Sequence, residues 1–199
     1  MSKIRIGGCD PGFANAAFSV LDLFPVGAST LLGTRLVVTS KGKGKFRLID
    51  DELRRLREIE DALIAFLDEW HPDVWAMEEP GKCLMRRPGG GGKTEWATNP
   101  SLLRTSCLMW GSVSGICRSR GIYVVQYGSQ AIKKAICGSN KASKTDMEKE
   151  IKRRYGGYKG WATSKKIEHE VDSVGAAVTA FREPFVMTLL RSLENNASS

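Results

Sequence analysis

Three carboxylates and a histidine stand where the sequence pattern suits metal-dependent phosphodiester chemistry. Asp10 ends the first apolar segment, and Glu78 ends a later one. His169 and Asp172 are three residues apart in a segment of helical pattern, so they share one helix face. Carboxylate oxygens suit Mg²⁺ or Mn²⁺, and two such ions about 4 Å apart can activate water and stabilise a leaving oxygen. A cluster of acids also needs a compensating cation, because bare carboxylates repel one another.

The segments that carry these residues have the hydrophobic patterns of strands and helices. Alternation or continuous apolar runs predict strands over residues 3–10, 15–24, 31–38, 74–77 and 122–126, whereas three-and-four spacing predicts helices over 49–70, 100–120, 131–137, 146–155 and 167–182. Ser129 is expected to cap the third helix, and Thr145 with Glu148 to form a capping box at the fourth. If the first and fourth strands are parallel neighbours, Asp10 and Glu78 lie at one sheet edge, where α/β sheets bind ligands.

Residues 81–99 are predicted to form a long irregular loop. A loop of this length in a compact domain is usually functional or disordered. It contains a run of four glycines, the apolar residues Leu84, Met85 and Trp96, and the basic residues Lys82, Arg86, Arg87 and Lys93. This composition predicts a segment that contacts a nucleic-acid backbone and offers a stacking or wedge group.

Length and charge limit the classes of protein. The 199 residues fit one domain with a substantial core, and we expect a single domain over residues 1–199. Thirty Lys and Arg against 22 Asp and Glu give a net charge of +8, which favours a polyanionic partner, nucleic acid before anionic membrane. No apolar run approaches the roughly 20 residues of a membrane span, so no membrane partner is expected.

The cysteines and the N-terminus indicate a cellular compartment. The five cysteines are widely spaced and include no Cys-x-x-Cys pair, so no zinc is expected. Free thiols fit a reducing interior, and the N-terminus lacks the apolar core of a signal peptide. We therefore expect an intracellular protein, with a bacterial or phage-infected cytoplasm favoured and an organelle not excluded.

Four motifs in order resemble the RuvC Holliday junction resolvases of the RNase H-like superfamily. They are Asp-Pro-Gly at 10–12, Ala-Met-Glu at 76–78, the segment 127–144 with Lys133 and Lys144, and His-x-x-Asp at 169–172. The resemblance implies an α/β RNase H-like fold, with a five-stranded mixed sheet of three antiparallel and two parallel strands flanked by helices. It also implies a homodimer that binds a four-way DNA junction and nicks two symmetrically related strands in recombination and repair.

By the same resemblance, Asp10, Glu78 and Asp172 are metal-binding carboxylates. His169 stands where the family has a fourth acid or a histidine, so it is either a ligand or a group that helps to activate water. Lys133 and Lys144 are implied to contact phosphates or to stabilise developing charge. The chain departs from the family after Glu78, where Pro80-Gly81 replaces the common aromatic wedge and the following loop is longer.

Three other functions stay open on the sequence. An RNase H-like nuclease of broader specificity, which cuts flaps, forks or RNA:DNA hybrids, would have the same acids. The actin-like and sugar-kinase fold also opens with a strand, an aspartate and a glycine turn, but 199 residues are few for its two lobes. A junction-binding protein without catalysis would not require the acids at all.

Overall fold

The computed structural model describes residues 2–25, 27–42, 44, 47–80, 84–88, 94–161 and 166–197. For residues 84–88, 94–98 and 196–197 it describes the backbone alone.

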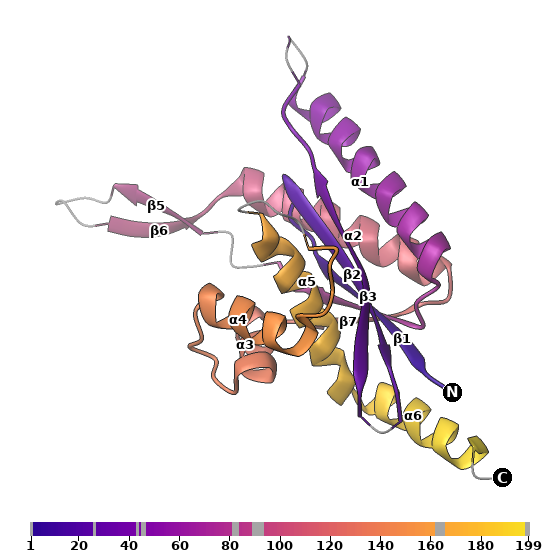
Figure 1. The fold of residues 1–199 in the computed structure, drawn as a ribbon. Coiled ribbons are helices and arrows are strands. Elements are labelled where there is room, and N and C mark those ends of the chain that lie inside the picture. The colour runs from indigo at the N-terminus through magenta and orange to yellow at the C-terminus, as the bar shows by residue number, and fades with distance from the viewer. Residues whose placement is uncertain are drawn as a thin grey trace.

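The centre of the molecule is a five-stranded mixed sheet in the order β3-β2-β1-β4-β7 (Figure 1). Its strands are β1 (Ile4–Asp10), β2 (Asn15–Leu23), β3 (Ser29–Val38), β4 (Val74–Glu78) and β7 (Tyr123–Tyr127). β1, β2 and β3 pair antiparallel, whereas β4 is parallel to both β1 and β7. The predicted division into three antiparallel and two parallel strands is therefore confirmed.

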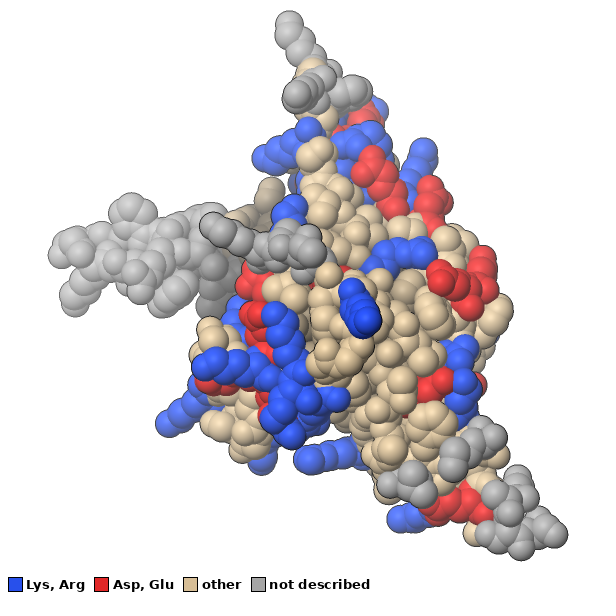
Figure 2. Space-filling model, in the orientation of Figure 1, with Lys and Arg blue, Asp and Glu red and all other residues tan. Residues whose placement is uncertain are grey.

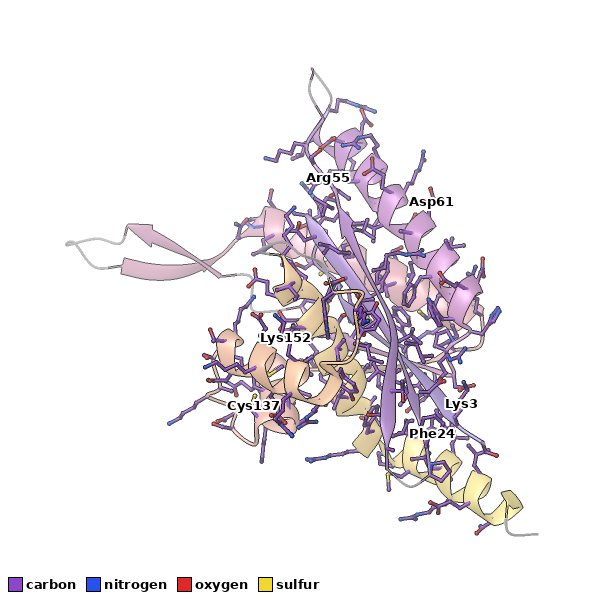
Figure 3. All side chains as sticks on the ribbon, in the orientation of Figure 1. Lys3, Phe24, Arg55, Asp61, Cys137 and Lys152 are labelled. Carbon is purple, nitrogen blue, oxygen red and sulfur yellow. The ribbon has the colours of Figure 1, made fainter. Side chains whose placement is uncertain are left out.

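Helices cover both faces of this sheet. α1 (Leu48–Trp70) and α2 (Pro100–Ser119) pack on one face, and α3 (Ser129–Cys137), α4 (Lys144–Tyr155) and α5 (Ile167–Thr179) pack on the other. In Figure 3, Arg55 marks the first layer, and Cys137 and Lys152 mark the second. Successive side chains of β4 pack on opposite faces of the sheet. Val74 and Ala76 belong to the core beneath α3, α4 and α5, whereas Trp75 and Met77 belong to the core beneath α1 and α2.

Two consecutive glycines let the layers approach β1 closely. A Cβ atom on Gly8 would lie 2.1 Å from the backbone oxygen of Ser173, and one on Gly7 would lie 2.2 Å from the Trp75 ring. Contacts this short do not occur between real atoms, so both positions require glycine. The close packing of α5 against β1 therefore depends on Gly8, and so does the position of the α5 residues near Ser173.

The prediction of an irregular loop over residues 81–99 is wrong. β5 (Leu84–Pro88) and β6 (Thr94–Thr98) form an antiparallel hairpin, which Figure 1 shows projecting from the body of the molecule. Neither segment alternates between apolar and polar residues, so neither carries the period-two signal of a strand. The glycines at 89–92 fall between the two strands in sequence.

The predicted helix caps are also wrong. Gly128 is the N-cap of α3, so Ser129 is its first residue, and Ser143 caps α4. The Ser143 hydroxyl accepts from the backbone N–H of Asp146 at 3.1 Å, and the Asp146 carboxylate accepts from the Ser143 N–H at 2.9 Å. The Ser143–Asp146 capping box forms in place of the predicted Thr145–Glu148 box. It starts the helix two residues earlier and satisfies the same kind of free backbone N–H group.

The C-terminal part of the chain differs in a further way. α5 ends at Thr179 and continues as one turn of 3₁₀ helix, Ala180–Arg182, rather than as α-helix to residue 182. A helix that the sequence reading missed, α6 (Pro184–Ala197), follows and buries Val186 and Leu190 in the core of the α5 layer.

Within the described residues, no helix is long and apolar enough to cross a membrane. The four described cysteines, Cys9, Cys107, Cys117 and Cys137, are free thiols, as expected.

Candidate active site

The parallel pairing of β1 with β4 brings two of the predicted acids to one edge of the sheet. Cys9 pairs with Met77, so Asp10 and Glu78 are the next residues on adjacent strands, at the carboxyl ends of both. A cavity of about 210 Å³ opens beside them and is lined by both side chains. This is the edge at which open α/β sheets bind ligands.

α5 adds the histidine to this edge. His169 Nδ1 lies 2.6 Å from Asp10 Oδ2, within hydrogen-bonding distance, and both side chains are about four-fifths buried (21% and 17% exposed). This hydrogen bond to a carboxylate raises the pKa of His169 above its usual value, because it favours the charged imidazolium. The other ring nitrogen, Nε2, lies 3.9 Å from Glu168.

Asp172 lies three residues after His169 and faces a second cavity of about 210 Å³. Glu78 lines this cavity too, so it connects the two hollows, and Lys133 and Lys144 line the opposite side. Lys144 Nζ lies 3.6 Å from Asp172 Oδ2 and 3.1 Å from Glu168 Oε2. The two lysines named in the sequence analysis are thus beside the acids, although they come from different helices.

The acids in these cavities are close enough to disturb one another's titration. Burial, together with the charges of Asp10 and Asp172, raises the pKa of Glu78 to about 7 against the opposing effect of Lys144 and Lys133. Burial, with a contribution from the charge of Asp10, likewise raises the pKa of Asp172 to about 6. Carboxyl groups that resist ionisation at neutral pH lack sufficient positive charge around them.

The acidic residues have the chemistry that a divalent cation requires, but the described side chains do not form a complete coordination site. Among the described residues, no three His, Cys, Asp or Glu side chains are placed so that they could hold a metal ion. Asp10 is instead turned to His169, and Asp172 to Lys144. Buried carboxylates that lack neutralising charge nevertheless form a hard oxygen donor set, which fits Mg²⁺ or Mn²⁺.

The basic residues at 81–99 that were predicted to contact DNA have side chains that the structure does not describe. Lys82 and Lys93 lie outside the described residues, and Arg86 and Arg87 belong to β5, of which only the backbone is described. The hairpin follows β4 in the chain, so it leaves the sheet from the edge that carries Glu78.

Two further side chains line the Asp10 cavity without having been predicted. Glu79 lies beyond the end of β4, where the alternation of strand side chains no longer holds, and it lines the cavity as well as Glu78. Ser106 of α2 completes this wall. No local pattern predicts a role for Ser106, because its position depends on how α2 packs across the sheet.

No family model matches the chain. It is 29% and 27% identical, each over 144 residues, to crossover junction endodeoxyribonucleases RuvC from two Prochlorococcus marinus strains; both matches cover 72% of the chain and 77% of the relative. It is 25% identical over 181 residues to RuvC of Granulibacter bethesdensis, which covers 89% of the chain and 84% of the relative.

Two solved structures share the fold. Thermus thermophilus RuvC in complex with a Holliday junction substrate superposes with a TM-score of 0.70 at 20% identity, and covers 92% of the chain and 97% of its own. The yeast mitochondrial Holliday junction resolvase Ydc2 gives a TM-score of 0.61 at 13% identity, with 98% of the chain and 83% of its own covered. The fold is therefore RNase H-like, as predicted.

Proposed function

We propose that this chain, a RuvC-type resolvase in sequence and fold, is a divalent-metal-dependent endonuclease that resolves four-way DNA junctions by paired symmetric nicks. The observation that carries the proposal is the meeting of Asp10, Glu78 and Asp172 around two adjoining cavities at the carboxyl ends of parallel strands. The curated relatives, which are named as crossover junction endonucleases, support the choice of substrate.

In this proposal Asp10, Glu78 and Asp172 hold the cation, which is Mg²⁺, with Mn²⁺ as a substitute. A bound divalent ion polarises a phosphate oxygen and provides hydroxide from water near neutral pH. His169 acts beside Asp10, either as a fourth ligand or as a base toward the attacking water. Lys144, already within 4 Å of Asp172, would turn to the scissile phosphate or its developing charge when the cation neutralises the acids.

We infer that the protein acts as a homodimer. A four-way junction offers two symmetrically related strands, and one active site can cleave only one of them at a time. Exposed apolar side chains near the starts of α1 and α2, Leu48, Leu102 and Leu103, are consistent with a self-complementary surface. Light scattering of the purified chain, alone and with one molar equivalent of junction, tests this inference.

The other parts of the proposal are the single-domain organisation over residues 1–199 and action in a bacterial or phage-infected cytoplasm. A nuclease of broader specificity is the second candidate, since the same acids would serve it. The actin-like alternative has no support in the described residues, whose strands form one five-stranded sheet and one hairpin rather than two lobes.

A cleavage panel separates these functions. The chain is incubated with an immobile four-way junction, a flap, a fork, a duplex and an RNA:DNA hybrid, each with Mg²⁺, Mn²⁺ or chelator. We expect ligatable nicks in two opposing junction strands, only when metal is present, and much slower cleavage elsewhere. The Asp10→Asn variant, purified by the same procedure, controls for contaminating nucleases. Equal rates on flap or hybrid would favour the broader nuclease, and cleavage of none of the substrates would end the proposal.

A further inference from the structure

Most of the excess positive charge of the chain lies in one continuous part of it. Residues 128–161, which comprise α3, α4 and the segment after them, contain nine Lys and Arg and three Asp and Glu, or +6 of the total +8. Figure 2 shows Lys and Arg side chains gathered over this region. Lys133 and Lys144 form the end of the region that reaches the active-site cavities.

The other end of the region opens into a separate cavity of about 350 Å³, here called the distal cavity. It lies between the start of β3, at residues 29–31, and the end of α4 with its following turn, at residues 154–159. Arg154 and Lys159 line it, and none of the described residues in its wall is acidic. This distinguishes it from the active-site cavities, each of which is lined by at least two carboxylates.

Hydroxyl groups in the distal cavity have hydrogens to donate. The Ser29 and Tyr155 hydroxyls lie 2.8 Å apart, and whichever donates in this bond, the second retains its own hydrogen. The Tyr158 hydroxyl accepts from the backbone N–H of Thr34 at 2.8 Å, and it donates its own hydrogen to Thr34 Oγ1 at 3.3 Å, because the Thr34 hydroxyl donates to Glu170. Hydroxyl donors next to cationic side chains are the groups that contact phosphate oxygens in nucleic-acid complexes.

The two cations differ in their freedom. Arg154 donates from Nε to Glu150 at 2.8 Å and from Nη2 to the backbone oxygen of Ile136 at 2.7 Å, so its guanidinium is fixed between α3 and α4. Lys159 is exposed and has no interaction partner among the described residues. Lys159 is therefore the charge that can turn to an incoming anion without breaking an existing bond.

Strand register sets the separation from the active site. Ser29 is level with Leu23 of β2, and Leu23 is level with Ile4 of β1, so the distal cavity is beside the beginning of β1 while Asp10 is at its end. Six residues of strand span about 20 Å. This equals about six base pairs of duplex at about 3.4 Å each, which is too far for the cavity to contact the scissile phosphate.

We propose that the distal cavity binds backbone phosphates of one duplex arm, at least about six base pairs from the point of cleavage. The proposal rests on the proposed function and names a second contact of the same substrate. Lys159 neutralises the phosphate while the Ser29–Tyr155 hydroxyl pair offers the hydrogen that it retains. The contact would fix the direction of an arm rather than read its sequence, because phosphates carry no sequence information.

The test combines a change in the protein with a change in the DNA. Lys159→Ala, Lys159→Arg and the control Arg57→Ala, an exposed residue of α1 on the other sheet face, are compared with the wild type. Each binds a junction with ordinary arms and one whose arm phosphates between about five and nine base pairs from the branch are methylphosphonates. For Lys159→Ala on ordinary arms we expect about threefold to tenfold weaker binding at about 50 mM salt, with the salt slope lower by about 0.9.

Neutralising the arm should weaken wild-type binding by a similar factor and should abolish the difference between wild type and Lys159→Ala. Lys159→Arg should bind like the wild type, and Arg57→Ala should show no coupling to the arm phosphates. The proposal would be overturned if Lys159→Ala and the neutral arm weakened binding independently, so that their effects on affinity multiplied. It would also be overturned if the wild type bound the neutral arm as tightly as the ordinary one. Nicking of the junction by saturating Lys159→Ala should continue, so a failure here is distinct from a failure of the nuclease proposal.

Discussion

His169 Nδ1 and Asp10 Oδ2 lie 2.6 Å apart although 159 positions separate the two residues in the chain. The contact joins the last strand position of β1 to the first turn of α5, so it couples the sheet edge to the helix that carries Asp172. It also gives Asp10 a partner within hydrogen-bonding distance on that helix.

The His169–Asp10 contact predicts a measurable titration. In metal-free protein, NMR titration of the His169 ring should give a pKa above the usual value of about 6.5. Asp10→Asn removes the negative charge and should lower that pKa. Saturating Mg²⁺ should lower it too, because a cation near Asp10 opposes protonation of the ring. A His169 pKa that is the same in wild type and Asp10→Asn would contradict the contact. His71, for which no salt bridge is found among the described residues, provides the internal reference.

Asp10→Asn should separate catalysis from binding. Replacing one oxygen ligand by an amide nitrogen weakens a hard-cation site, so junction cleavage in Mg²⁺ should fall by about a thousandfold or more. Junction affinity in chelator should change little, because the basic region over α3 and α4 is untouched. Gel-shift and cleavage assays on one preparation provide the comparison, with Glu58→Gln on the exposed face of α1 as control. Retained cleavage by Asp10→Asn would remove Asp10 from the site.

Stability in chelator should increase as the pH falls from about 8 to about 5.5. Glu78 and Asp172 have folded-state pKa values of about 7 and about 6, above the unfolded values near 4. The folded state therefore binds more protons than the unfolded state over this range, so these two groups destabilise the fold as the pH rises. Together they should contribute about 1–3 kcal/mol, or about 3–10 °C in Tm.

The matching control is Glu78→Gln, whose Tm should vary less over the same pH range. Adding Mg²⁺ at pH 8 should raise the wild-type Tm by mass action and raise that of Glu78→Gln less. A wild-type Tm in chelator that increases with pH over this range would contradict the assignment of buried, poorly compensated acids.

Lys144→Ala should affect both binding and rate. Its ammonium group is 3.6 Å from Asp172 and lines the cavity that Glu78 shares, so its loss removes a phosphate contact next to the acids. Junction affinity should fall several-fold at low salt, and the salt slope should decrease by about 0.9. The cleavage rate at saturating protein should fall as well. Arg57→Ala, an exposed residue of α1 on the other face of the sheet, is the control. An unchanged rate and slope would assign Lys144 to a solvated helix face.

Gly8→Ala tests how the site is assembled. The added methyl group would meet the Ser173 backbone oxygen at 2.1 Å, so α5 must move away from β1. We expect a loss of about 1–3 kcal/mol in the free energy of unfolding, measured by urea denaturation, and a marked loss of cleavage because Asp172 moves with the helix. Gly115→Ala, at a position of α2 where nothing lies within 4 Å, should be neutral or slightly stabilising. Normal cleavage by Gly8→Ala would show that the spacing of α5 and β1 is not critical.

Much of this protein was determined by local sequence. The alternation in β1, the continuous apolar run of β4 and the helical stripe of α1 each follow from whether one or both faces of an element are buried, which the sequence records directly. The placement of Asp10 and Glu78 at strand ends also follows from local pattern. Together with the order of four short motifs, these features predicted the five-stranded sheet and the acids.

Only the tertiary structure decided how these residues meet. The His169–Asp10 contact, the seat of α5 over Gly8 and the presence of Ser106 beside Glu78 all depend on packing between segments far apart in the chain. The β5–β6 hairpin escaped prediction because neither of its strands alternates between apolar and polar residues, and α6 escaped it because this helix gains its burial only by docking against the core of α5. The distal cavity is of the same kind, since the start of β3 and the end of α4 become neighbours only when the two layers pack together.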